Sequence, residues 1–216
     1  MIVSLNEVES LTMKACRGAG MSWGLAEEAA QAARWLAVRG SAWDRSLVAL
    51  LARRGDVSPP RALVSDVRPT AQGTALCPIH AGAAIADLLR PGERLTLHDV
   101  LEPMWLVPFA HRRAGLVHTA RLTWVDGVMN IDVTGPDTDA AAPIHLSATR
   151  VAWISVELSG RRAPTSGASP AGEESGGTTI DPSAWAALEA WTARTYVAAS
   201  LQSRMAGAGA GLSDND

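Results

Sequence analysis

The sequence is poor in several residues that would mark particular classes of protein. Only two cysteines, Cys16 and Cys77, occur among 216 residues, too few for the disulfide framework of a small secreted protein. No stretch approaches the roughly 18 consecutive apolar residues of a membrane-spanning helix, and the first residues lack the basic and apolar segments of a signal peptide. We therefore expect a soluble, cytoplasmic protein with reduced thiols and no membrane partner.

Strong charge of one sign is also absent. The formal net charge is −3, which gives no electrostatic argument for a nucleic-acid partner. All basic residues except Lys14 are arginines, and eight of the ten aromatic residues are tryptophans. With 47% hydrophobic residues, the chain has enough apolar material for a sizeable core.

The first third of the sequence predicts three helices. Ser4 and Glu7 have the spacing of a capping box, in which the serine hydroxyl and the glutamate carboxylate each accept a backbone N–H. Ser22 can cap a second helix that Gly40 closes, because glycine tolerates the backbone conformation that ends a helix. A third helix is expected from Trp43 to Arg54.

The middle of the sequence changes to the pattern of a sheet. Apolar residues alternate with polar ones from Arg94 onward and again over 118–125, which predicts strands. Asp126-Gly127 then predicts a hairpin, because glycine allows the positive φ that such turns need. Two further strands are expected, at the Trp/Phe-rich segment 105–110 and at 145–157.

These patterns predict an α+β fold with N-terminal helices, a mainly antiparallel sheet of four to five strands, and a C-terminal helix packed back after a flexible loop. The expected body is a single domain over 1–159. A loop or linker rich in Gly, Ser and Pro follows at 160–180. Asp181 and Pro182 then begin a helix over 181–206 that docks on the body, and 207–216 forms a Gly-rich acidic tail.

The N-terminal third resembles the malate/L-lactate dehydrogenase-like family, which binds nicotinamide cofactors without a Rossmann fold. The resemblance rests on these segments: Ser4-Leu5-Asn6-Glu7-Val8, Ala15 to Gly20, Glu27-Glu28-Ala29, Arg39-Gly40 and Gly73-Thr74-Ala75-Leu76. In that family a catalytic Ser-His-Gly motif follows Arg-Gly, whereas Ser41-Ala42-Trp43-Asp44 follows here. No catalytic residue is therefore carried over, and NAD is disfavoured as a cofactor.

The whole chain resembles an uncharacterised proteobacterial family, a domain of unknown function. The resemblance is clearest at Arg194-Thr195-Tyr196 and at the Gly-rich end from Gly207 to Asp216. It implies a bacterial protein and supplies no activity.

Cys77 and His80 form the most suggestive pair of reactive side chains. A helix is expected at 79–89, with Cys77 at its N-cap, where the helix dipole favours a thiolate, and His80 one turn along. A cysteine beside a histidine is a recognised nucleophilic arrangement, so both are candidate catalytic residues. The alternative is a buried Cys77 that packs as a small hydrophobic residue, with His80 near the helix end.

His111, Arg112 and Arg113 are candidate ligand-binding residues. Two guanidinium groups beside an imidazole suit a carboxylate or a phosphate, because arginine presents paired donors to such anions. The alternative is a solvated turn. For Arg53-Arg54, at the end of the third helix, we favour the interpretation of cations that suit the helix dipole.

Metal and nucleotide sites have little support in the sequence. No Cys-x-x-Cys or His-x-x-x-His spacing is present, so a metal is disfavoured as a cofactor. The run from Gly207 to Gly211 lacks the preceding strand and following helix of a phosphate-binding loop.

Two functions remain. The first is a small-molecule catabolic enzyme or a ligand-binding protein for an anionic metabolite, which requires Cys77, His80, Arg112 and Arg113 to converge in one cavity. The second is a non-catalytic partner subunit that docks through its C-terminal helix or tail, as part of a homo- or hetero-oligomer.

Overall fold

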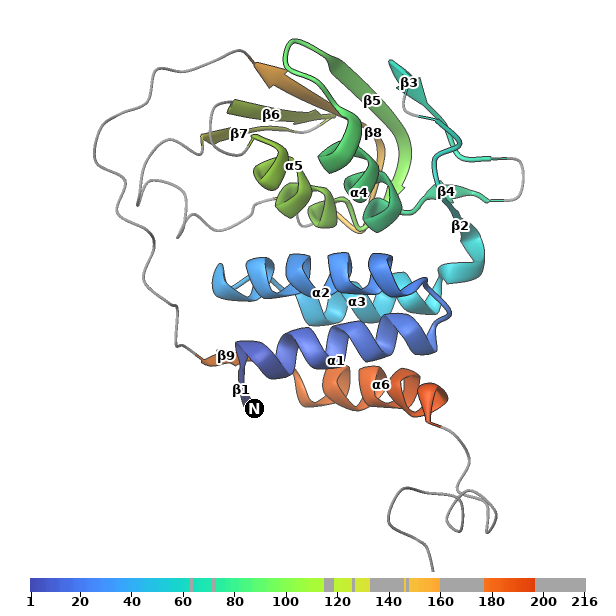
Figure 1. Ribbon diagram of the computed structural model, residues 1–216, viewed down its shortest axis with the longest axis vertical. Coiled ribbons are helices and arrows are strands. Elements are labelled where there is room, and N and C mark those ends of the chain that lie inside the picture. The colour runs from blue at the N-terminus through green and yellow to red at the C-terminus, as the bar shows by residue number, and fades with distance from the viewer. Residues whose placement is uncertain are drawn as a thin grey trace, which may run out of the picture.

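The structure is a computed structural model that describes residues 1–62, 64–70, 73–114, 119–125, 127–132, 146, 148–159 and 177–196 (Figure 1). It confirms the predicted α+β class, including the C-terminal helix. The α-helices of the described residues are α1 Leu5–Gly18, α2 Trp23–Val38, α3 Trp43–Ala52, α4 Pro78–Leu88, α5 Leu106–Ala114 and α6 Pro182–Thr192.

The helices α1 and α2 begin and end where the sequence predicts, whereas α3 ends at Ala52, two residues before the predicted Arg54. Ser4 caps α1 by accepting the Glu7 amide at 3.2 Å, and the Glu7 carboxylate accepts the Ser4 amide at 2.7 Å. Ser22 caps α2 by accepting the Leu25 amide. Gly20, after α1, has a φ of +82°, a conformation that side-chain-bearing residues rarely adopt. The chain can therefore turn sharply from α1 into α2.

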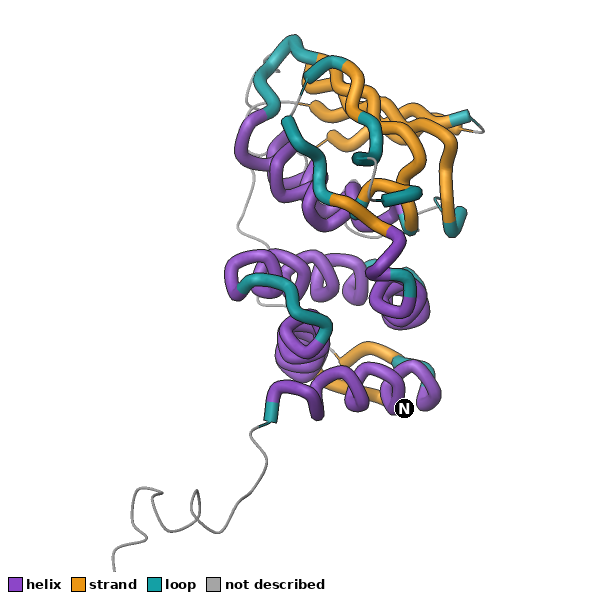
Figure 2. Tube along the Cα trace, turned by 90° about the vertical axis from the view of Figure 1, so that its right-hand side faces the viewer, coloured by secondary structure: helices purple, strands orange, loops and turns teal. Residues whose placement is uncertain are grey.

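The helices form layers below the sheet. In Figure 1 the sheet lies at the top with α4 and α5 beneath it, followed by α2 and α3, then α1, and α6 at the bottom; Figure 2 shows the same stack from the side. One apolar cluster fills the lower helical layers and reaches the first turn of α4. A second lies between the sheet and the helices α4 and α5. Trp35 on α2 packs against both clusters, so the two layers share one continuous interior.

A close approach of two helices places α6 against the end of α1. A Cβ atom on Gly18 would lie 1.8 Å from the backbone oxygen of Trp191. Only glycine lets the two backbones come this near. The contact fixes the position of Trp191 and of Arg194, which follows α6.

The sheet is larger and more mixed than predicted. The strands are β1 Ile2–Ser4, β2 Val57–Ser58, β3 Asp66–Val67, β4 Ala75–Leu76, β5 Arg94–Leu101, β6 Thr119–Trp124, β7 Gly127–Asp132, β8 Arg150–Ser159 and β9 Gly177–Thr179. Seven strands form the main sheet in the order β2-β4-β5-β8-β6-β7, with β3 also paired to β5. The four long strands are antiparallel, as expected, whereas β2, β3 and β4 add parallel pairs. The predicted count of four to five misses these two-residue strands, which are too short to show alternation.

The hairpin predicted around Gly127 is confirmed, with Trp124 opposite Gly127 in the β6–β7 pairing. The predicted strand at 105–110 is wrong. Residues Pro103–Trp105 form a 3₁₀ turn and α5 follows. Periodicity alone does not separate a short buried strand from a buried helix, and Pro108 stands in the first turn of α5, where proline is tolerated.

The C-terminal part agrees with the prediction at the start of its helix and differs before and after it. The long strand expected from 145 begins at Arg150. Asp181 caps α6 by accepting the Ser183 amide at 2.8 Å, and Leu188 is fully buried on the side of the body. The helix predicted over 181–206 is shorter than expected, because α6 ends at Thr192 and a 3₁₀ turn follows over Ala193–Thr195. The loop predicted over 160–180 contains strand β9 at its end. Residues 160–176, 197–206 and the tail at 207–216 lie outside the described residues. Strands β1 and β9 form a second sheet that the sequence patterns did not indicate.

Candidate functional site

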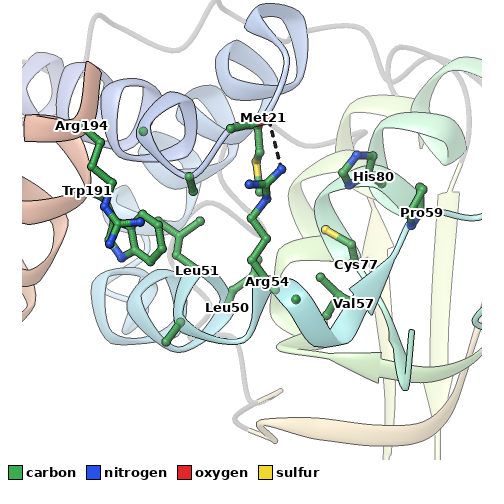
Figure 3. A pocket seen from close by; sticks show the side chains of 15 residues that line it. Met21, Leu50, Leu51, Arg54, Val57, Pro59, Cys77, His80, Trp191 and Arg194 are labelled. Carbon is green, nitrogen blue, oxygen red and sulfur yellow. Dashed lines mark hydrogen bonds between the residues drawn. The ribbon is translucent and has the colours of Figure 1, made fainter. Parts of the chain in front are cut away.

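A cavity of about 730 Å³ lies between the helical layers and the start of α4. Its walls come from four segments far apart in the chain: the end of α1 with the following turn, α3 with the chain that leads to β2, the first turn of α4, and the end of α6. Figure 3 shows Arg54 between Trp191 and Arg194 on one side and Cys77 and His80 on the other. The volume falls within the range of about 300–1,000 Å³ that is usual for small-molecule sites.

Cys77 stands at the N-cap of α4, as predicted, but its thiol is enclosed. The residue is 1% exposed. Burial raises the pKa of the Cys77 thiol, and the opposing effects of the His80 and Ile79 amides and of the Arg54 charge do not offset it. Of the two interpretations of Cys77, the buried one agrees with the structure, and the exposed thiolate with a lowered pKa does not, since a helix N-terminus favours the anion only where solvent or a cation compensates its burial.

His80 lines the same cavity from the first turn of α4. Burial lowers its pKa below the usual 6.5, and the nearby Arg54 charge lowers it further. The buried Nδ1 atom of His80 has no hydrogen-bond partner among the described residues. The imidazole is thus neutral near pH 7, when one ring nitrogen carries a proton and the other can accept a hydrogen bond.

Two arginines that the sequence did not single out as ligand-binding complete the cavity. Arg54 follows α3, and its Nη2 donates to the Gly20 carbonyl at 3.0 Å. Arg194 follows α6, and its guanidinium lies 3.9 Å from the centre of the Trp191 ring. No sequence signal distinguishes Arg54 from any other arginine at a helix end. Only the fold brings it opposite α4.

The arginines of this cavity lack the carboxylate partners that many others have. Within the described ranges, no Asp or Glu lies within ion-pair distance of Arg54 or Arg194, and none lines the cavity. By contrast, the following arginines each pair with a carboxylate: Arg34, Arg45, Arg53, Arg68, Arg94, Arg112 and Arg150. Guanidinium groups without a protein carboxylate, in a concave site, can bind an external anion.

The predicted ligand-binding residues His111, Arg112 and Arg113 lie elsewhere, on the last turn of α5. Arg112 pairs with Glu28 of α2 at 2.5 Å, and Arg113 Nε donates to the Leu89 carbonyl. The His111 ring lies 5.1 Å from the ring of Trp35. The expected convergence of these residues with Cys77 and His80 is therefore wrong: they connect α5 to α2 and to the end of α4.

A second buried polar cluster joins α3 to the end of β5. Ser46 Oγ donates to the Glu102 carboxylate at 2.5 Å and accepts the Trp105 indole N–H at 3.0 Å. Glu102 is 5% exposed and has a φ of +47°. Burial raises the pKa of its carboxyl. None of the three residues lines the cavity of Arg54. The cluster instead links α3 to the residues that follow β5.

Other kinds of site have no candidates in the described part of the chain. No group of three His, Cys, Asp or Glu residues is arranged to hold a metal ion there. None of the helices described is long and apolar enough to cross a membrane. The Gly-rich segment 207–211 considered for nucleotide binding lies outside the described residues.

Comparison with known proteins concerns the N-terminal part of the chain. No curated protein and no solved structure matches the chain. The likeness to the malate/L-lactate dehydrogenase-like family therefore stays a prediction. The matched segment, residues 3–73, includes α1 to α3 and Arg54, whereas Cys77, His80 and Arg194 lie outside it. Residues 3–73 match the family described as Protein of unknown function (DUF3726), which agrees with the expected likeness to a family of unknown function.

Proposed function

We propose that the protein binds a small anionic metabolite in the cavity between α1, α3, α4 and α6. One observation supports this above all: Arg54 and Arg194, without a carboxylate partner in the described residues, face the same cavity as His80. Each guanidinium can give paired hydrogen bonds to a carboxylate or phosphate. Cytoplasmic location and bacterial origin, both expected from the sequence, are part of the proposal.

His80 makes this binding dependent on pH. Burial and the Arg54 charge both lower the pKa of the imidazole. An anion bound beside it would offset the Arg54 charge and raise that pKa again. Binding should therefore take up a proton and become tighter as the pH falls below the ordinary histidine value of 6.5.

Binding is better supported than covalent catalysis. A nucleophilic Cys77 would have to ionise, and its enclosed thiol has a raised pKa. The partner-subunit alternative needs a free apolar face on the C-terminal helix or docking through the tail. On α6, Ala184, Leu188 and Thr192 pack into the body, and the tail lies outside the described residues.

A thermal-shift screen tests the proposal. Phosphate, pyrophosphate, citrate, succinate and acetate would be compared with neutral and cationic compounds at pH 6, because a ligand that binds the native state raises the melting temperature. Hits would be measured by calorimetry on the wild type, on Arg54→Gln, which keeps a hydrogen-bond donor for Gly20, and on Arg68→Ala. Arg68 is an exposed arginine directly after β3, 3.6 Å from Asp66, so its loss changes the net charge by the same amount as the loss of Arg54.

We expect Arg54→Gln to weaken anion binding at least about tenfold, the usual effect of losing a charge-assisted hydrogen bond. Arg68→Ala should bind as the wild type does. Equal losses in the two variants would show that only net charge matters. That result, or the failure of every anion to bind, would refute the proposed site.

A further inference from the structure

A second basic hollow lies beside the cavity, at the other side of Arg194. It has a volume of about 390 Å³ and is lined by Met13, Lys14, Arg17, Trp23, Arg194 and Thr195. Arg194 is common to the cavity and to this hollow, which we call the Lys14 groove. Gly18 lines the cavity and Arg17 lines the groove, so the two also meet at the end of α1.

The Lys14 groove has cations and no carboxylate in its lining. Arg17 donates to the Met21 carbonyl and stacks on the Trp23 ring, 4.5 Å from its centre. Lys14 is exposed and also lines a hollow that contains Glu7 and Glu189. Within the described part of the chain, neither Lys14 nor Arg17 has a carboxylate within ion-pair distance.

We propose that the ligand carries two separated anionic groups, one in the cavity at Arg54 and His80 and one in the Lys14 groove, with Arg194 between them. This inference rests on the proposed function and narrows its ligand to dianions and polyanions. A monoanion held at Arg54 and His80 would leave the Lys14 groove empty, and Lys14 and Arg17 have no carboxylate within ion-pair distance among the described residues. A ligand with two anionic groups can place one in the cavity and the other in the Lys14 groove. The second group adds to the affinity, because the bound first group already holds it close to the groove.

Linear phosphates of increasing length provide the probe. Phosphate, pyrophosphate, tripolyphosphate and tetrapolyphosphate carry the same chemical group over increasing lengths. A parallel series of straight-chain dicarboxylates tells whether the site selects phosphate or any dianion. Calorimetry would compare the wild type with Lys14→Ala, Arg17→Gln, Arg54→Gln and the control Arg68→Ala.

The inference predicts a particular pattern of affinities. In the wild type, the affinity should increase with the length of the phosphate chain. Lys14→Ala should lower the affinity for tetrapolyphosphate about fivefold, as expected for the loss of an exposed charge. The same variant should leave the affinity for phosphate unchanged. Because Lys14 is exposed, Lys14→Ala should fold as the wild type does. Arg17→Gln tests the same loss of affinity for the longest phosphate at a second residue of the groove.

Two outcomes would overturn the inference, and they differ from failure of the proposed function. Affinity that does not rise with length would exclude a second subsite. A rise that Lys14→Ala and Arg68→Ala reduce equally would reflect net charge alone. In both cases phosphate still binds and Arg54→Gln still weakens it, whereas failure of the proposed function abolishes that dependence on Arg54.

Discussion

Replacing Gly18 with alanine should separate α6 from α1 and disturb the cavity. The new Cβ would lie 1.8 Å from the Trp191 oxygen and 2.7 Å from its carbonyl carbon. Both atoms belong to the backbone, so no side-chain rotation relieves the overlap, and α6 must shift away from α1. Trp191 and Arg194 line the cavity and would move with it.

The magnitude follows from two opposing effects. Overpacking of a close contact costs about 1–3 kcal/mol, while alanine gains up to about 1 kcal/mol over glycine in a helix. We expect Gly18→Ala to lower the free energy of unfolding by about 1–2 kcal/mol. Gly24→Ala is the matched control, because Gly24 lies in α2, where an added Cβ atom would have no neighbour within 4 Å. It should be neutral or stabilise by about 0.5 kcal/mol.

Urea denaturation followed by circular dichroism measures both variants, and calorimetry with pyrophosphate measures the site. Gly18→Ala should lose stability and anion affinity together, and Gly24→Ala should lose neither. If Gly18→Ala were as stable as Gly24→Ala, the close α1–α6 contact, and with it the position of Arg194, would be wrong.

Three further predictions concern buried titratable groups. Glu102→Gln should stabilise the protein at pH 7 by about 1 kcal/mol, because it removes a charge that burial penalises. In urea titrations this gain should vanish below pH 4.5, the ordinary carboxyl pKa, because Glu102 is then protonated in both the folded and the unfolded protein. Because the pKa of His80 is lower in the folded protein than the ordinary 6.5, the unfolded chain takes up the proton first, and the free energy of unfolding falls as the pH drops below 6.5. Melting curves should show a weaker pH dependence for His80→Gln. Burial raises the pKa of both thiols, to about 12 for Cys16, so Cys16 and Cys77 should resist iodoacetamide at pH 8 until urea unfolds the chain. Rapid labelling of Cys77 in the native protein would restore the hypothesis of a nucleophilic Cys77.

The sequence predicts local structure well where a single short signal determines it. The Ser4–Glu7 capping box, the Asp181 cap and proline at the start of α4 depend on neighbouring residues alone, and the structure has all three. The hairpin at Gly127 is of the same kind. Short strands such as β4 are different, because their pairing with β5 and β2 is determined by distant segments.

The sequence predicts the candidate site only in part, for the same reason. Cys77 and His80 are near in sequence and do line one cavity. Their electrostatic partner is Arg54 rather than Arg112, and no local pattern distinguishes the two arginines. Arg112 meets Glu28 across a helix pair, whereas Arg54 is brought to α4 by the stacking of layers. The burial that raises the Cys77 pKa is likewise a property of the complete fold.

An anion that binds between Arg54 and His80 should change the titration of His80 itself. Nuclear magnetic resonance of the imidazole resonances, with and without saturating pyrophosphate, gives the pKa of His80 directly. We expect a His80 pKa below 6.5 in the free protein, a rise of that pKa on addition of pyrophosphate, and a smaller rise in Arg54→Gln. If pyrophosphate binds by calorimetry but leaves the His80 pKa unchanged, the anion binds elsewhere and the site between Arg54 and His80 is refuted.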